Sequence, residues 1–497
     1  MQWPRPLTPA LSPLTRGEGE ILRKEVGRTI GCIRSREGPV FLSPRARGER
    51  EIWRTGLQLH DVFHSTLWRI YPSPRVSRER AGATANVVKR LASPSPRVSG
   101  ERAGVRGRGN CVVLANLFFL CLACICALCG CSHRQGQNAV PARAAAEDDP
   151  AWKIIAPFFQ PPADYTTPSE AYRSPLRFND GQPVASAADW PRRRAEILKQ
   201  WHDLMGPWPA VIERPNVETL ATTHRDNFTQ HRVRLDIAPG QTGEGWLLVP
   251  EGAGPFPAVL VVYYEPETSV GLGKQPLRDF AYQLTRRGFV TLSIGTPGGN
   301  AYKPDIGSAR CQPLSFHAYV AANGWNALAS RRDVDARRIG IVGHSYGGKW
   351  SLFGGALWEK FACVAVSDPG IVFDEKRPSI NYWEPWYLGL DPDHPRPARG
   401  LITPENPRTG AYKKMVETGR DLHELHALIA PRPFLVSGGA EDTPARWAAL
   451  SHTVAVNKLL GFTNRVGMTN RPAHTPTEES NAQLYAFFEH FLGRKTQ

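Results

Sequence analysis

The stretch Ile339–Gly348, IGIVGHSYGG, predicts the fold of this chain more strongly than any other. An apolar run ends at Gly343, and Ser345 stands between that glycine and Gly347. Glycine at both positions allows a strand to turn sharply into a helix, because a Cβ there would clash with the turn. Such a turn lifts the Ser345 hydroxyl above the edge of a sheet. It also points the backbone N–H of Tyr346 into the same space.

The residues around this stretch fit a strand, a turn and a helix. Arg338–Val342 is predicted to be a short buried strand, which a helix over Trp325–Ser330 precedes and a helix over Lys349–Glu359 follows. Gly-x-Ser-x-Gly alone is a weak signal, because glycine and serine are common residues. Between a strand and a helix, the motif indicates the nucleophile elbow of an α/β-hydrolase.

A serine at its normal pKa is a poor nucleophile and needs a base that a carboxylate orients. In α/β-hydrolases the chain order is serine, acid, histidine. The loop after the predicted strand Pro433–Ser437 contains Asp442, our predicted acid, which has the usual Gly-x-x-Asp spacing from Gly439. Two alternatives stay open. One is the neighbouring Glu441, and the other is Asp368, directly after the preceding strand.

The base must follow the acid in a loop before the last helix. His474 has this position and is the predicted base. His452 comes too early, on a helix predicted to start near Ala445, and His490 lies inside the closing helix.

Two backbone N–H groups are expected to bind the oxyanion that forms during acyl transfer. One belongs to Tyr346, directly after the serine. The other is expected after the strand Ala258–Tyr264, from Tyr264 or Glu265.

Strands and helices alternate along the catalytic part of the chain. This alternation predicts an α/β fold with a doubly wound, mostly parallel sheet and flanking helices. The strands are expected at His231–Ile237, Gly245–Val249, Ala258–Tyr264, Phe289–Ile294, Arg338–Val342, Phe361–Ser367 and Pro433–Ser437, and further helices at Trp190–Met205, Leu277–Arg287 and Gln483–Leu492.

An aromatic-rich insertion of about 65 residues separates Ser367 from Pro433, which is long for a plain connection. Loops at the carboxyl ends of strands commonly carry binding residues. Trp383 and Trp386 are therefore candidate substrate-binding residues. The alternative is that they form a local core.

The positive charge of the chain lies mostly at its N-terminus. Residues 1–130 hold 21 Lys and Arg against 9 Asp and Glu, which is most of the formal net charge of +15. The remainder is nearly balanced, so no nucleic-acid surface is indicated. Residues 1–110 repeat a Ser-Pro-rich unit at irregular spacing with little apolar content. They are expected to be a disordered extension, or a segment that is not translated at all.

Residues 111–131 are predicted to be a lipoprotein signal peptide. An apolar stretch follows three arginines, and Leu128–Cys131, LCGC, resembles a lipobox in which Cys131 is lipidated. A signal anchor is the alternative. Residues 132–165 are then expected to be a tether, and 166–497 the catalytic domain of an enzyme held at the bacterial cell envelope, in the periplasm or at the surface.

No cofactor or metal motif accompanies the elbow. Six of the nine cysteines lie in 111–131 and reflect the signal segment. The chain from Cys131 onward keeps three cysteines. If Cys131 is lipidated, Cys311 and Cys363 remain and could form a disulfide. The oligomeric state is not indicated.

Residues 190–493 resemble the α/β-hydrolase superfamily, in the branch of acetyl xylan esterases, dienelactone hydrolases and prolyl oligopeptidase-type catalytic domains. Two stretches carry the resemblance. Arg331–Gly340, RRDVDARRIG, precedes the elbow, and Leu428–Pro433, LIAPRP, precedes the predicted acid strand.

Within this branch, Lys349 and Asn381–Trp383, NYW, resemble glucuronoyl esterases, whose elbow reads Gly-Cys-Ser-Arg-x-Gly-Lys. In this chain His344 and Tyr346 stand in place of the cysteine and the arginine. The resemblance implies that Lys349 could bind a sugar hydroxyl or a uronate oxygen.

These observations predict an exported serine hydrolase that cleaves carboxylic esters of carbohydrates, either acetyl or uronate esters, on a small-molecule or polysaccharide substrate. Two other classes stay open. A serine peptidase of the prolyl oligopeptidase type would usually carry a propeller, and no blade-like repeats precede Gly343. A non-catalytic envelope lipoprotein would not need a serine, an acid and a histidine in order.

Overall fold

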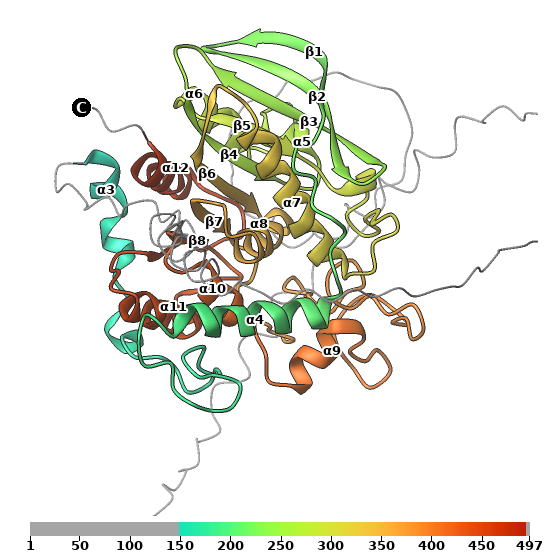
Figure 1. The fold of residues 1–497 in the computed structure, drawn as a ribbon, viewed down its shortest axis with the longest axis vertical. Coiled ribbons are helices and arrows are strands. Elements are labelled where there is room, and N and C mark those ends of the chain that lie inside the picture. Colours follow the sequence, from blue (N-terminus) through green and yellow to red (C-terminus); the bar gives the residue numbers. More distant parts are fainter. Residues whose placement is uncertain (1–148, 494–497) are drawn as a thin grey trace, which may run out of the picture. The chain divides into compact units, whose positions relative to one another are not determined.

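The computed structural model describes residues 149–493. In this part of the chain, a nine-stranded sheet has the strand order β1-β2-β3-β5-β4-β6-β7-β8-β9, and helices cover both of its faces (Figure 1). The predicted α/β fold with a doubly wound, mostly parallel sheet is therefore confirmed. None of the helices within 149–493 has the length and apolar character needed to cross a membrane.

Three antiparallel strands form one side of the sheet. They are β1 (Val217–Arg225), β2 (Phe228–Ala238) and β3 (Gln241–Pro250), and β3 joins the rest of the sheet by antiparallel pairing with β5. The hairpin of β2 and β3 was expected from alternating apolar residues. Strand β1 was missed because its side chains are mostly exposed and polar, so it lacks a buried face in the sequence pattern.

The remaining strands pair in parallel. They are β4 (Phe256–Val262), β5 (Val290–Ile294), β6 (Val334–His344), β7 (Cys363–Ser367), β8 (Phe434–Gly438) and β9 (Val466–Asn470). Parallel strands buried on both faces consist of nearly continuous apolar residues, as β4, β5 and β7 do. Their carboxyl ends meet at one edge of the sheet, called the carboxyl edge below.

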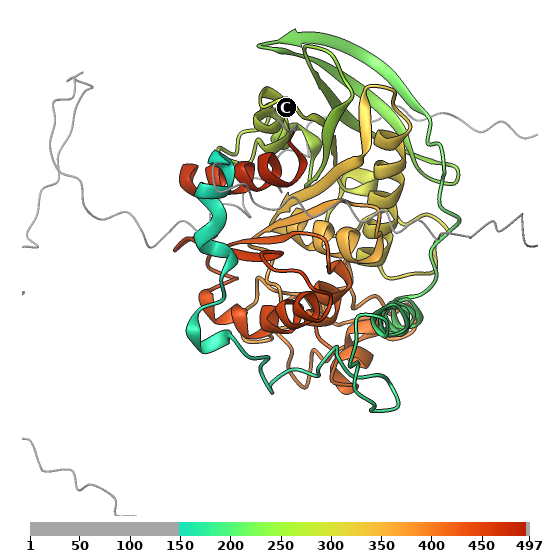
Figure 2. The same cartoon turned by 60° about the vertical axis from the view of Figure 1, so that its left-hand side comes forward.

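Two apolar layers enclose the sheet. Successive residues of β4 alternate between them, so that Leu260 contacts one layer and Val259 the other. The first layer is built from α4 (Trp190–Met205), α7 (Pro313–Ala329), α8 (Tyr346–Leu357), α10 (His423–Ile429) and α11 (Trp447–Leu459). The second is built from α3 (Pro150–Ile155), α6 (Phe280–Arg286) and α12 (Glu478–Leu492) (Figure 2).

The chain from Pro150 onward belongs to the folded body, which corrects residues 150–165 of the predicted tether over 132–165, and the first part of that tether lies outside the described residues. Helix α3 is followed by the 3₁₀ helices η1 (Ala156–Phe159) and η2 (Ala163–Tyr165). Ile155 and Phe159 are buried, and Trp152 stacks on His490 of α12 with ring centroids 4.8 Å apart. The segment looked like a linker because it is rich in alanine, proline and polar residues, yet Ile155 and Phe159 pack in the core while Ile154 stays 48% exposed.

The long insertion between β7 and β8 is folded. It contains α9 (Gly410–Glu417) and α10, which the sequence pattern did not reveal. Shorter elements lie outside the insertion, namely α5 (Pro266–Ser269) after β4, η3 (Pro297–Gly299) after β5 and η4 (Pro444–Arg446) after β8.

Cys311 and Cys363 are both buried free thiols, so the pairing that the sequence left open is not formed in the structure. They lie on different elements, in the segment before α7 and at the start of β7. The predicted extension, signal peptide and lipidation residue Cys131 lie outside the described residues.

Candidate active site

Ser345 occupies a strained turn between β6 and α8. Its backbone has φ 55° and ψ −112°, a conformation that a residue with a side chain seldom adopts. Its N–H donates to the carbonyl oxygen of Ser367 at 2.8 Å, and this bond ties the turn to the end of β7. The predicted strand, elbow and helix are therefore present, with the serine at the carboxyl edge.

The glycines that flank the serine are required by contact with the backbone. A Cβ on Gly347 would lie 2.0 Å from the carbonyl oxygen of Val262, at the end of β4. A Cβ on Gly343 would lie 2.3 Å from the carbonyl oxygen of Gly347. Strand β4 therefore packs directly against the elbow, which leaves no room for a side chain at either position.

His474 lies in the loop before α12 and pairs with a carboxylate. Its Nδ1 is 2.8 Å from Oδ2 of Asp368, which follows β7 and is fully buried. Asp368 also accepts backbone N–H bonds from Gly439 at 2.7 Å and from Asp442 at 2.8 Å. These bonds leave the carboxylate fixed in the plane from which it can orient the imidazole.

The structure corrects the predicted acid, because Asp442 does not contact His474. Its carboxylate accepts the N–H groups of Gly370 at 2.9 Å and Ile371 at 2.6 Å. The loops after β7 and β8 are therefore joined by reciprocal hydrogen bonds, in which the aspartate of each loop accepts backbone N–H groups of the other. Asp368 binds backbone groups of the β8 loop, while Asp442 binds those of the β7 loop. Glu441 points elsewhere and accepts from Arg377 at 3.3 Å.

The environment of Asp442 favours its protonated form. Burial, and next the negative charge of Asp368, raise its pKa from 3.8 to about 7, although the two backbone donors oppose this shift. Asp442 is thus only partly ionised at neutral pH, unlike a carboxylate that must hold an imidazolium.

Arg471 fixes the loop that carries His474, a role the sequence did not suggest. Its guanidinium donates to the carbonyl oxygens of Ser437 at 2.9 Å, His474 at 2.7 Å and Thr475 at 3.0 Å. It also donates to the Ser367 hydroxyl at 3.2 Å. The arginine thereby joins the ends of β7 and β8 to the histidine loop.

His344 covers one face of His474, with ring centroids 4.7 Å apart. Its Nδ1 lies 3.0 Å from the Ser367 hydroxyl. Burial, reinforced by the nearby His474 and Arg471, keeps its pKa well below the ordinary value. His344 is therefore neutral at physiological pH and acts as a wall of the site.

Two tyrosines flank the elbow where the oxyanion donors were predicted. The N–H of Tyr346 belongs to the first turn of α8 and so lacks a helical acceptor. The Tyr346 ring stacks on Tyr264 with centroids 4.7 Å apart, and its hydroxyl lies 2.5 Å from Nε2 of His317. Burial raises the pKa of Tyr264 to about 12, partly offset by a side-chain hydrogen bond with Ser345.

Lys349 is buried rather than directed to solvent. Its ammonium group donates to the carbonyl oxygens of Pro369 and Ser379, and it lies 4.8 Å from the centre of the Tyr382 ring. Burial lowers its pKa to about 8, although the nearby Asp442 opposes this. Lys349 thus supports the loop directly after Asp368, and its ammonium group also faces the rings of Tyr382 and Tyr387.

The two predicted substrate-binding tryptophans are buried. Trp383 is 0% exposed and donates to the carbonyl oxygen of Gly400 at 2.7 Å, so its ring has no free surface for the substrate contact predicted from the sequence. Trp386 is 5% exposed and packs against Tyr387 and Tyr302. The local-core alternative describes Trp383, because the insertion must bury apolar surface of its own.

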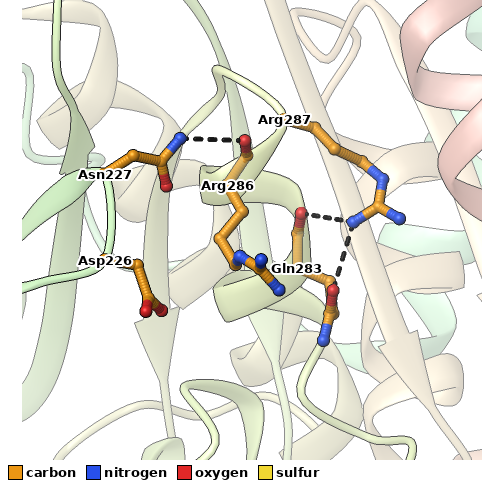
Figure 3. A pocket seen from close by; sticks show the side chains of 5 residues that line it. All are labelled: Asp226, Asn227, Gln283, Arg286 and Arg287. Atoms are coloured by element: carbon orange, nitrogen blue, oxygen red, sulfur yellow. Dashed lines mark hydrogen bonds between the residues drawn. The ribbon is translucent and has the colours of Figure 1, made fainter.

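Nothing in residues 149–493 groups three metal-ligating side chains around a common point. Figure 3 shows an open surface pocket of about 490 Å³. Its residues lie next to the amino end of β5, at the opposite edge of the sheet from Ser345. Its lining holds none of the predicted catalytic residues and consists of Asp226, Asn227, Gln283, Arg286 and Arg287.

Two curated proteins are similar in sequence, although no protein-family profile matches the chain. A 4-O-methyl-glucuronoyl methylesterase of Schizophyllum commune is 24% identical over 206 residues, which cover 41% of this chain and 50% of that protein. A putative hydrolase of Bacillus subtilis is 26% identical over 277 residues, or 51% of this chain and 83% of that protein. The chain spans about half the length of the first relative.

Solved structures share the fold. A glucuronoyl esterase from Solibacter usitatus superposes with a TM-score of 0.52 and 21% identity, covering 66% of this chain and 99% of that one. A promiscuous esterase from a marine bacterial metagenome gives a TM-score of 0.50 and 18% identity, covering 65% and 98%. The chain has the α/β-hydrolase fold, and the resemblance predicted from the sequence is confirmed at that level.

Proposed function

We propose that this protein, which has the α/β-hydrolase fold, is a serine esterase. It would cleave carboxylic esters of carbohydrates through an acyl-enzyme on Ser345. The observation that supports it most is the pair of His474 and the buried Asp368, 2.8 Å apart, at the edge that holds the strained Ser345. A serine, an imidazole and an orienting carboxylate form a unit that activates the serine without a metal or cofactor.

In this mechanism the Ser345 hydroxyl attacks the ester carbonyl while Nε2 of His474 accepts its proton. Asp368 holds Nδ1–H, which keeps the reactive tautomer and stabilises the imidazolium. The backbone N–H groups of Tyr346 and of Tyr264 or Glu265 bind the oxyanion. His474 then protonates the leaving alcohol, and water, activated by the same histidine, releases the acid.

The choice of a carbohydrate ester, and of a uronate ester ahead of an acetyl ester, rests on similarity and on Lys349. The curated relative is named for a glucuronoyl methyl ester, and the superposed structures include a glucuronoyl esterase. The ammonium group of Lys349 has three N–H donors and two carbonyl acceptors in the structure, so in this proposal its third N–H donates to a sugar oxygen. We further propose that the enzyme is exported and held at the cell envelope by a lipid on Cys131.

The full-length protein can be tested directly. A fluorophosphonate probe should label the wild type at Ser345, and the protein should hydrolyse a methyl glucuronate ester faster than an acetylated sugar or a peptide. Efficient peptide cleavage without ester hydrolysis would show that the protein is a peptidase and would overturn the proposed esterase activity. An absence of both labelling and hydrolysis would make the chain a binding protein.

Lys349→Met should raise KM for a methyl glucuronate ester about tenfold and leave KM for a small aryl acetate unchanged, because one charge-assisted hydrogen bond is worth about 1.5–3 kcal/mol. Since the pKa of Lys349 is lowered to about 8, KM for the uronate ester should also rise above pH 8 in the wild type only. Steady-state kinetics between pH 6 and pH 9.5 measures both effects. Equal changes for the two substrates would instead mark Lys349 as a support of the Asp368 loop.

A further inference from the structure

An aromatic and cationic cluster, called the rim cluster below, is formed by the exposed side chains of Tyr302 and Arg399 over the buried ring of Trp386. The Tyr302 ring meets Trp386 edge to face, with centroids 5.2 Å apart. The Arg399 guanidinium lies 4.2 Å from the centre of the Tyr302 ring and 4.9 Å from that of Trp386. The sequence did not suggest this cluster, because Tyr302 and Arg399 belong to different loops.

The loop that carries Arg399 is held in place from below. Three buried side chains bind the backbone of Gly400, the next residue. Trp383 and Arg396 donate to its carbonyl oxygen at 2.7 Å and 3.0 Å, and Glu384 accepts its N–H at 2.8 Å. Arg399 is therefore presented by a rigid turn, which lowers the entropy lost when a ligand binds.

The rim cluster is continuous with the candidate active site. Trp386 packs on Tyr387 at 6.0 Å, and Tyr387 packs on Tyr346, the residue after the nucleophile, at 5.8 Å. Tyr302 follows η3 in the loop after β5, so it lies at the carboxyl edge with Ser345. Because only two ring contacts separate Tyr346 from the rim cluster, a substrate that extends from the serine would reach the cluster.

The exposed chemistry of the cluster matches a sugar ring. Tyr302 is 56% exposed, and the neighbouring Leu401 is 43% exposed. Within residues 149–493, the side chain of Arg399 makes no hydrogen bond or ion pair, so its donors are free. An aromatic ring packs against the C–H face of a pyranose, and a planar guanidinium donates two parallel hydrogen bonds to neighbouring oxygens.

We propose that the rim cluster is an accessory subsite that binds a pyranose unit of the polysaccharide next to the sugar that carries the cleaved ester. The proposal rests on the proposed function for its substrate. It goes further in assigning Tyr302 and Arg399 the selection of polymeric over monomeric esters.

The test compares a methyl glucuronate ester as a monosaccharide with the same ester carried on a xylo-oligosaccharide. Arg399→Ala and Tyr302→Ala should each raise KM for the oligosaccharide about tenfold, or about 1.4 kcal/mol, and leave kcat and the monosaccharide kinetics unchanged. Arg286→Ala is the matched control. That arginine is also exposed and lies 5.5 Å from a tyrosine ring, but it lines the pocket at the opposite edge of the sheet (Figure 3).

The result would overturn the subsite if both variants keep the wild-type KM for the oligosaccharide, or if they change both substrates equally. Calorimetric titration of the wild type and both variants with an unesterified xylo-oligosaccharide separates this proposal from the proposed function. Weaker binding by the variants supports the subsite even if no ester is cleaved. Equal binding, or none to the wild type, rejects it even if esters are cleaved.

Discussion

Ser345→Ala is expected to lower kcat by about 10⁵–10⁶ and to remove labelling by a fluorophosphonate probe. The serine supplies the atom that becomes acylated, and the members of a catalytic triad act as a unit, so losing one removes most of their joint effect. Alanine fits the same turn, since it is smaller than serine and the backbone at φ 55° already accepts a Cβ. The thermal unfolding temperature should therefore stay close to that of the wild type.

Ser351→Ala is a matched control for this prediction. Ser351 lies six residues further on α8, is fully buried, and donates to the carbonyl oxygen of Gly347 at 2.8 Å. Its loss should affect stability slightly and chemistry little. If Ser345→Ala retains more than about a hundredth of the wild-type kcat, an acyl-enzyme on Ser345 is excluded.

Asp368→Asn should lower kcat by about 10³–10⁴ with little change in KM. An amide cannot hold the Nδ1–H tautomer of His474 as a carboxylate does, so Nε2 is no longer available as the base. The fully buried side chain also accepts backbone N–H bonds from Gly439 and Asp442, which the amide oxygen can keep in part. The loss should therefore appear in turnover before it appears in folding.

Asp442→Asn is the comparison that decides between the two carboxylates. Asn keeps an oxygen for the N–H groups of Gly370 and Ile371, and the aspartate it replaces is already partly protonated at neutral pH. We expect a loss in kcat of less than about tenfold. If Asp442→Asn is inactive while Asp368→Asn keeps nearly the wild-type kcat, Asp442 in the β8 loop is the catalytic acid.

The same substitution has a signature in stability. The pKa of Asp442 is raised from 3.8 to about 7 in the native state, so the folded protein keeps a proton that the unfolded chain releases near pH 4. The free energy of unfolding should therefore fall as pH rises from about 4 to 7, insofar as Asp442 determines it. Denaturant titrations at these pH values should show a smaller fall for Asp442→Asn. An identical pH dependence in both proteins would contradict the shifted pKa.

Periodicity in the sequence predicted most elements of the fold. The helix Trp190–Met205 has the bounds expected from its apolar spacing, and the buried strands lie within a few residues of their predicted positions. Strand β9 was missed because its short run, Val466–Asn470, mixes a glycine and polar residues with two apolar ones. Its strand character comes from pairing with β8, which no local pattern reports.

The site was only partly predictable for a related reason. Ser345 and His474 stand out by motif and loop position, whereas the acid depends on which of two loops reaches the histidine. Asp368 and Asp442 both follow a buried strand, and they are equally consistent with the chain order. The choice is made by contacts across more than 70 residues of sequence, as when the carboxylate of Asp368 binds the N–H of Gly439.

The close contact between Gly347 and the end of β4 has a consequence for how the enzyme would respond to its substrate. Because a single methyl group at Gly347 would collide with the carbonyl oxygen of Val262, the turn after β4 and the start of α8 behave as one rigid block. The N–H group of Tyr346 and those in the turn after β4 are then aligned when the chain folds, before any ester arrives. Turnover in such preorganised enzymes depends little on loop closure at the elbow. The N–H groups that would stabilise the substrate's ester carbonyl are therefore already in position in the protein without substrate.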